Sequence, residues 1–242
     1  MKKGKFVNYV AALSILALAA CSPQQESAQA KPPAQENPSS IDKKASPVTP
    51  VETDLPAGTY TLDKAHTSIL FRVDHIGFSM YTARFLDFDA TLELDPKQPE
   101  AASLSATVEA ASIETDYPDP ETADFNAMLR GPEWLDAEAN PQMSFISTAI
   151  EMTGGDTAKI TGDFTLRGVT RPLVLDAKFN GGYKGFAPYD PQARIGFSAR
   201  GKLKRSDYGL VVGLPTTEFP IGVGDGVEII IETELLGPPL VE

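Results

Sequence analysis

Apolar and polar residues alternate along most of the chain from residue 57 onward. Ile69, Phe71 and Val73, for example, stand at every second position of one segment, and the charged Arg72 falls between the last two. This period of two residues is typical of a β-strand with one buried and one exposed face. Eight segments show it, at residues 68–75, 88–94, 103–110, 143–150, 160–166, 173–179, 195–203 and 227–235. We predict a strand for each.

Turn-forming residues separate these segments, so we predict short connections and little helix. The clearest turn signals are Asp95-Pro96, Gly154-Gly155, Arg167-Gly168 and Gly181-Gly182. One short helix is predicted at residues 123–129, where Phe125, Met128 and Leu129 have helical spacing. Eight amphipathic antiparallel strands bury their apolar faces by closing a barrel or by stacking two sheets, and the composition favours the barrel. The predicted fold class is therefore all-β, an eight-stranded antiparallel barrel with one short helix.

The inward-facing positions determine whether such a barrel is hollow. Several of these positions are small, among them Ala90, Ala106, Ala177 and Ala199, with glycine at Gly162 and Gly201. Small side chains leave room for a ligand, but they would equally let the walls close together. Apolar pockets are built from ordinary core residue types. The alternation therefore leaves both a hollow and a filled barrel open.

Residues 1–20 have the features of a bacterial secretory signal, because three lysines precede an apolar run that is too short to span a bilayer. The run ends at Leu18–Cys21, which resembles the lipobox of bacterial lipoproteins, and Cys21 is the only cysteine of the chain. We predict that Cys21 is lipidated and holds the protein on a membrane. Ser22, rather than Asp, follows it, which favours the outer membrane of the bacterial cell envelope, with the protein facing the periplasm. The alternative is an ordinary signal peptide with a chance cysteine.

Residues 22–56 contain seven prolines and no aromatic residue. A segment with so little apolar surface cannot order itself by burial, and its proline content makes it semi-extended. We therefore predict the lipidated cysteine and a disordered tether over residues 21–56. The folded domain then covers residues 57–237 and a short tail covers residues 238–242.

The net charge of −12 and the scarcity of cysteine and histidine exclude several classes of function. An acidic chain lacks the basic surface that nucleic acid requires, and a single cysteine allows neither an internal disulfide nor a cysteine-based zinc cluster. His66 and His75 could form a metal site with Asp63 and Asp74, but the histidines are nine residues apart, which is unsuited to one ion. We predict structural histidines, no metal, no cofactor and no catalytic residue. The oligomeric state stays open, and a dimer is compatible with the sequence.

Several short motifs, taken in order, resemble those of the YceI-like family. They are Asp63–Phe71 with His75–Ser79, Ser112–Thr115, Pro141–Ser147, Gly162–Pro172, Arg205–Leu210 and Val223–Val227. Gly162–Pro172 is the most diagnostic, and together the motifs span about residues 57–237. The chain departs from the family at Phe125–Leu129, where the family often has Arg-Asp-x-His-Leu. This change makes the segment more apolar and calls into question a polar contact from it to a ligand head group.

The resemblance implies an extended, lipocalin-like barrel with an apolar tunnel that binds a polyisoprenoid chain, such as the tail of an isoprenoid quinone or a polyprenyl lipid. We predict that inward-facing residues bind this lipid: Ile69, Phe71, Val73, His75, Phe85, Phe88, Met143, Phe145, Phe164, Leu166, Leu175, Phe197, Ala199 and Ile229. The predicted work is sequestration or transfer of the lipid without covalent chemistry. The alternatives are a filled barrel that serves as an envelope stress or interaction protein, and a metal-dependent hydrolase.

Overall fold

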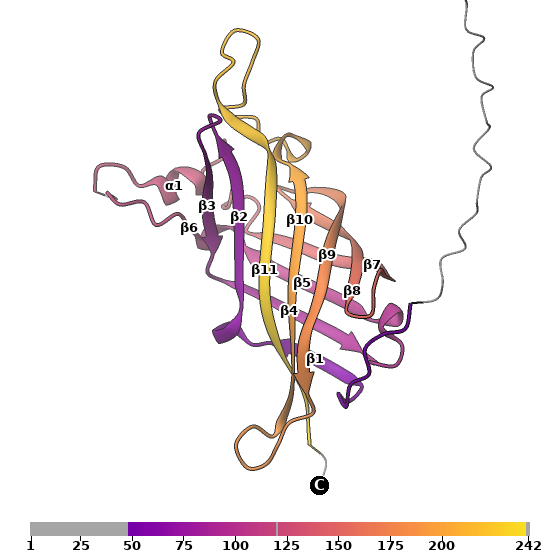
Figure 1. The fold of residues 1–242 in the computed structure, drawn as a ribbon. Helices are drawn as coiled ribbons and strands as arrows, with labels where there is room; N and C mark the ends of the chain where they lie inside the picture. Colours follow the sequence, from indigo (N-terminus) through magenta and orange to yellow (C-terminus); the bar gives the residue numbers. More distant parts are fainter. Residues whose placement is uncertain (1–47, 120, 241–242) are drawn as a thin grey trace, which may run out of the picture. The chain divides into compact units, whose positions relative to one another are not determined.

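The strands of the computed structural model follow the alternation of the sequence but outnumber the predicted ones (Figure 1). The structure describes residues 48–119 and 121–240. Within these residues one antiparallel sheet has eleven strands. They are β1 (Gly58–Leu62), β2 (Ser68–His75), β3 (Ser79–Phe85), β4 (Phe88–Leu94), β5 (Ser103–Glu109), β6 (Ile113–Glu114), β7 (Gln142–Met152), β8 (Thr157–Leu166), β9 (Val169–Tyr183), β10 (Gln192–Lys204) and β11 (Val223–Pro239).

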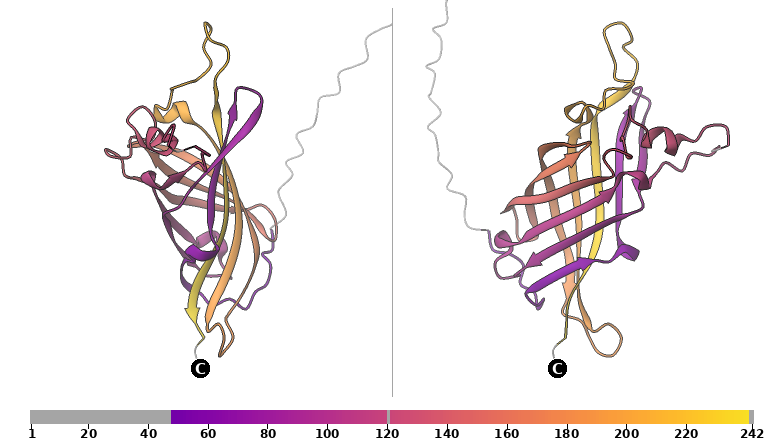
Figure 2. Two further views of the ribbon diagram at one scale, coloured as in Figure 1. Left: turned by 90° about the vertical axis from the view of Figure 1, so that its left-hand side faces the viewer. Right: turned by 180° about the vertical axis from the view of Figure 1, so that it is seen from behind.

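β1 closes the sheet into a barrel, because it pairs on one edge with β4 and on the other with β11. The closed ring consists of β1, β4, β5, β7, β8, β9, β10 and β11. Closure gives each strand of the ring two neighbours and so removes the unpaired backbone edges that an open sheet would expose. The prediction of an eight-stranded antiparallel barrel with a short helix is confirmed, and Figure 2 shows the barrel from two further sides.

β2, β3 and β6 form a branch on this ring. β11 is seventeen residues long, and its Leu235 and Leu236 pair with β1 while Val223–Glu232 lie along β2. β2 pairs with β3, and β3 pairs with β6. The segment 68–75, which we predicted as a ring strand, therefore belongs to the branch, and β1 takes its place in the ring. The alternation misses β1 because the strand has only five residues.

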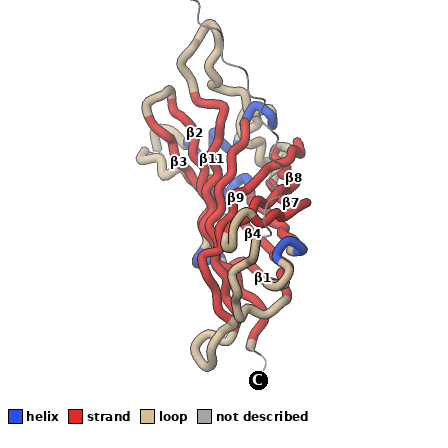
Figure 3. Tube along the Cα trace, turned by 45° about the vertical axis from the view of Figure 1, so that its right-hand side comes forward, coloured by secondary structure: helices blue, strands red, loops and turns tan. Residues whose placement is uncertain are grey.

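The α-helix of the described residues, α1 (Phe125–Arg130), starts and ends within two residues of the predicted helix at 123–129. Asp124 caps the helix by accepting a hydrogen bond from the backbone N–H of Ala127 at 2.8 Å. The other helical segments are short 3₁₀ turns: η1 (Lys64–His66), η2 (Pro99–Ala101), η3 (Ala110–Ser112) and η4 (Arg205–Tyr208). Figure 3 shows how small the helical part is. No helix in the described ranges is long and apolar enough to cross a membrane.

The segment just before β1 packs against the barrel, although the sequence places residues 50–56 in the tether. Leu55 is only 7% exposed and lies in a core cluster with Tyr60. The backbone N–H of Val51 donates to the carbonyl oxygen of Gly155 at 2.9 Å. Packed structure therefore begins before the predicted domain boundary at residue 57, and we call residues 50–56 the strap.

The two ends of the chain differ in how they meet the predicted boundaries. The predicted signal, Cys21 and most of the predicted tether fall in residues 1–47, outside the described residues. At the other end, the predicted tail begins inside β11, which continues to Pro239. The backbone N–H of Leu240 then donates to the carbonyl oxygen of Pro191 at 2.8 Å, so the chain is held there one residue beyond the strand.

Candidate functional site

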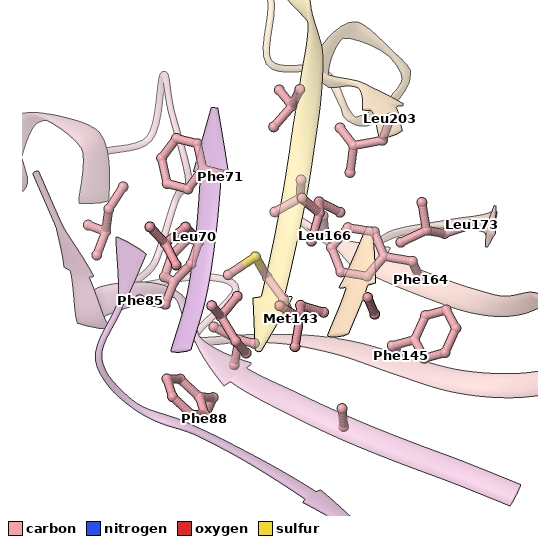
Figure 4. Close-up of a pocket in the computed structure, with 18 of the residues that line it drawn as sticks. Leu70, Phe71, Phe85, Phe88, Met143, Phe145, Phe164, Leu166, Leu173 and Leu203 are labelled. Atoms are coloured by element: carbon pink, nitrogen blue, oxygen red, sulfur yellow. The ribbon is translucent and has the colours of Figure 1, made fainter. Parts of the chain in front are cut away.

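The inward side chains of the barrel leave an apolar cavity of about 720 Å³. In Figure 4, Phe71 and Phe85 lie on one side of the cavity, and Phe145, Phe164 and Leu173 lie on the other. Most of the wall consists of Leu, Ile, Val, Phe and Ala side chains, because the strand period turns the polar residues outward. The barrel is therefore hollow, and its interior has the size and chemistry of a pocket for an apolar ligand.

All fourteen predicted lipid-binding positions line this cavity. They are Ile69, Phe71, Val73 and His75 of β2, Phe85 of β3, Phe88 of β4, Met143 and Phe145 of β7, Phe164 and Leu166 of β8, Leu175 of β9, Phe197 and Ala199 of β10, and Ile229 of β11. The structure thus brings together side chains that are up to 160 residues apart in the sequence. His75 differs from the others because it is exposed at the end of its strand. That these residues bind a lipid stays a prediction.

The small inward residues serve two different purposes. Ala90, Ala106 and Ala177 line the cavity and leave room in it. At Gly162, by contrast, an added Cβ would lie 2.4 Å from the ring of Phe145, so glycine is needed there for the walls to pack. Small inward residues therefore leave room for a ligand at some positions and let the walls pack closely at others.

Part of the wall comes from outside the barrel strands, and the alternation does not identify it. Phe125 and Leu129 of α1 and the following Trp134 all line the cavity. The ring of Phe125 packs edge-on against that of Tyr81, with 5.9 Å between the ring centroids. Its centroid lies 5.6 Å from that of the Tyr117 ring. The helical spacing of Phe125 and Leu129 is the signal that could have identified them. No periodic pattern marks Trp134.

The cavity reaches solvent near the end of β2. His75, Tyr117 and Ala123 belong to its wall and are exposed, and we call the end of the cavity that they line the mouth. Asp89 marks a further exposed point at the start of β4. Near β1 the wall consists of shielded residues such as Leu235. A ligand would therefore enter most directly at the mouth.

Arg205, at the start of η4, is the one buried charged residue among the described residues, and it lines the cavity. Its guanidinium donates hydrogen bonds of 2.8–3.0 Å to four backbone carbonyl oxygens, those of Leu210, Val212, Val223 and Gly224. Burial lowers the pKa of Arg205 from its usual value. The side chain therefore fastens both ends of the loop between η4 and β11.

A group of charged residues lies on the outer surface near the end of β1. Arg194 donates to Asp63 at 2.6 Å and to Glu234 at 2.7 Å, and Nδ1 of His66 lies 2.8 Å from the same carboxylate of Asp63. The hydrogen bonds from His66 and Arg194 lower the pKa of Asp63 to about 2. This charged network joins η1, β10 and β11.

The network also bears on the metal site that the sequence left as an alternative. Asp63, His66 and Glu234 lie close enough to share an ion, but Arg194 already occupies both carboxylates with its positive charge. His75 is at the far end of β2, so the extended strand separates it from His66 by roughly 25 Å. The structure therefore does not bring the two histidines together.

Comparison with known proteins gives consistent similarities. A family model described as the YceI-like domain matches residues 60–235. The chain is 35% identical over 181 residues to Protein YceI of Salmonella arizonae, covering 74% of this chain and 86% of that protein. The crystal structure of the Campylobacter jejuni YCEI protein is 32% identical with a TM-score of 0.57, covering 74% of this chain and 98% of that one.

A more distant structure shares the fold alone. It is that of a polyisoprenoid binding domain from Saccharophagus degradans implicated in plant cell wall breakdown. Its identity to this chain is 13% and the TM-score is 0.51, with 76% of this chain and all of that one covered.

Proposed function

Because the chain belongs to the YceI-like family, we propose that its barrel binds a long-chain polyisoprenoid or a similar amphiphilic lipid. The cavity of about 720 Å³ is the observation that carries this proposal. A filled barrel, which would serve only as an interaction surface, has no use for such a space. The polyisoprenoid binding domain of Saccharophagus degradans supports the choice of lipid, since it shares this fold.

Burial of alkyl surface is the driving force we propose. Each buried methylene contributes about 0.8 kcal/mol, at about 25 cal/mol per Å² of apolar surface. Since charged groups are rare on the wall, the affinity should rise with the length of the isoprenoid chain and should depend little on salt. An isoprenoid quinone and a polyprenyl lipid both meet these requirements. Binding of this kind involves no covalent step, so the proposed role is sequestration or transfer.

We place this activity in the bacterial cell envelope, with the barrel facing the periplasm and Cys21 carrying the lipid anchor. The apolar run and the Leu18–Cys21 motif support this location. The outer membrane is favoured because Ser22 follows the cysteine. In this position the protein would meet membrane lipids at short range.

Organic extraction of the purified full chain, followed by mass spectrometry, tests the proposed function. We expect a polyprenyl species in an amount close to that of the protein. Protein that has been unfolded by heat, freed of lipid and then mixed with the same lipid serves as the control for lipid that adheres without a cavity. Extracts without any long-chain lipid, from protein that also fails to take up an added isoprenoid quinone or polyprenol, would overturn the proposal.

A further inference from the structure

Two loops at the mouth end of the barrel expose large apolar side chains. One, residues 76–80, comprises the turn between β2 and β3 and the first two residues of β3, and its Phe78 is 85% exposed. The other is residues 211–222, where Phe219 is 73% exposed and Ile221 is 72% exposed. The loops lie side by side, since the backbone N–H of Ile76 donates to the carbonyl oxygen of Gly222 at 3.2 Å. We call them the mouth loops, and Figure 2 shows both at the same end of the barrel.

The mouth loops carry almost no charge. Glu218 is the one charged residue among their 17 positions. Charged residues make up 22% of the chain, so roughly four would be expected in a segment of this length. Soluble proteins rarely expose apolar groups that lie together in this way without a binding partner. The loops also lack the Lys and Arg residues that would attract anionic lipid, so any contact with a membrane must depend on the apolar side chains.

An apolar path leads from the mouth loops into the cavity. His75 and Val223 pair with each other across β2 and β11, and both line the cavity. His75 directly precedes one mouth loop and Val223 directly follows the other. A chain that leaves the cavity at this point therefore arrives beside the mouth loops.

The opposite end of the barrel offers a useful contrast. The loop between β9 and β10 also exposes aromatic residues, Phe186 and Tyr189. This loop contains the charged Lys184 and Asp190, and the cavity wall at that end is shielded from solvent. Within the part of the chain that the structure describes, exposed aromatic side chains, scarcity of charge and an open cavity coincide only at the mouth loops.

We propose that the mouth loops dock on a lipid bilayer and insert their apolar side chains into its interface. This inference rests on the proposed function, because docking lets a lipid pass between bilayer and cavity without exposing its alkyl chain to water. Aromatic side chains at the interface are a common means of contact with membranes. The mouth then faces the acyl chains directly.

The length of the chain before the barrel is compatible with docking. Residues 22–47, fully extended, span at most roughly 90 Å. The longest strand, β11, has 17 residues, or roughly 55 Å. An anchor at Cys21 would therefore permit either end of the barrel to meet the membrane, and the mouth loops would select one of them.

The first test places a tryptophan at each end of the full chain. Phe219→Trp adds it to a mouth loop, and Tyr189→Trp adds it to a similarly exposed site at the opposite end; the wild-type chain, with Trp134 alone, gives the background. In phosphatidylcholine vesicles with brominated acyl chains, we expect strong quenching of the Phe219→Trp variant and little of the Tyr189→Trp variant. Equal quenching of the two, or no quenching of either, would overturn the proposal. Quenching that rises with the protein concentration and not with the lipid concentration would also overturn it, because the partner of the mouth loops would then be a second copy or another protein.

The second test removes the apolar side chains and follows lipid transfer. Phe78→Ser combined with Phe219→Ser should slow the uptake of a labelled polyprenol from vesicles by roughly tenfold. Polyprenol bound at equilibrium in detergent should stay at the wild-type level. The matched control, Phe186→Ser with Tyr189→Ser, should leave both unchanged. An unchanged uptake rate in the Phe78→Ser, Phe219→Ser variant refutes docking. A wild-type protein that binds no polyprenol in detergent refutes the proposed function instead. In that case the quenching experiment still decides whether the mouth loops dock on the bilayer.

Discussion

A substitution at Val73 can test whether the cavity is the lipid-binding site. It is 8% exposed on the inner face of β2 and lines the cavity. Val73→Trp should fill part of this space, at a cost of about 1–3 kcal/mol in stability from overpacking. We expect a folded barrel that has lost lipid uptake, measured by the mass spectrometry of organic extracts.

The outer face of β9 supplies the matched control for this substitution. Val174 is 42% exposed and points away from the cavity, so Val174→Trp makes the same change of side chain outside it. This variant should keep the wild-type amount of lipid. If the folded Val73→Trp variant also kept it, the cavity would not be the binding site.

We predict that the buried Arg205 contributes strongly to the stability of the fold. Arg205→Met leaves four backbone carbonyl oxygens without their hydrogen bonds, and we expect a loss of about 2–4 kcal/mol in the free energy of unfolding, measured with urea. Arg200→Met, on the exposed pair with Glu232, serves as the control and should cost less than about 1 kcal/mol. Equal effects of the two substitutions would contradict a fastening role for Arg205.

At this scale the sequence predicts the inner face of the strands well. Each inward position follows from a period of two residues, so Phe145, Phe164 and Phe197 could be assigned without a structure. The wall contributed by Trp134 could not, because no strand period reaches it. Nor could the buried state of Arg205, since arginine is usually exposed and its four partners are backbone atoms that no sequence pattern reveals.

The strap is an element that the sequence assigned to a disordered region. Limited proteolysis of the full chain should leave a resistant core that starts near residue 50. Leu55→Ser removes the main buried side chain of the strap, at a cost of about 2–4 kcal/mol, and should move the start of the core toward β1. The mass of the fragment measures this start. Thr53→Ala, at an exposed position, should leave it unchanged; a core that starts at β1 in the wild-type chain would show that the strap does not hold.

The charged network that joins η1, β10 and β11 should make stability depend on pH. The pKa of Asp63 is lowered from 3.8 to about 2 in the folded chain, so the unfolded chain binds a proton at a higher pH than the folded one. The stabilisation, at most about 2 kcal/mol, is present above pH 4 and disappears as the pH falls toward 2.

Unfolding by urea at several pH values measures this contribution. Asp63→Asn should destabilise the protein at pH 6 and should make little difference near pH 2. Asp176→Asn, at an exposed pair with Lys159, should change the unfolding free energy by less than about 1 kcal/mol throughout. A constant gap between wild type and Asp63→Asn from pH 6 to pH 2 would be inconsistent with the lowered pKa.

Elements with strong alternation were predictable, and their ends were not. β9 begins four residues before its predicted start and β11 ends four residues after its predicted end. Backbone pairing continues where the apolar pattern stops: Gly181 pairs with Gly196, and Pro239 pairs with Gln192. β3 was not among the eight predicted strands, although its Tyr81, Ala83 and Phe85 stand at every second position. Its pairing with β2 supports the mouth.

The predicted anchor concerns the whole molecule. Cys21→Ser removes the only thiol that a lipid could modify. We expect the variant to leave the outer-membrane fraction, because without acyl chains on residue 21 the mature protein has lost its predicted anchor. It should be recovered as soluble protein or as uncleaved precursor. Labelling with a fatty-acid probe measures lipidation directly. Absence of label in the wild-type chain would refute the anchor, and cleavage of an ordinary signal peptide would then explain the apolar run.

The closure of the ring by β1 and β11 has a consequence for how the protein is made. Thr61 pairs with Leu236, so the first and last strands of the barrel meet only after nearly the whole chain has been synthesised. Contacts this distant in sequence form slowly, because a long loop must close before they contribute. The barrel therefore cannot close until its final strand appears. That delay suits a protein whose predicted route leads through a translocation channel, which only an unfolded chain can thread.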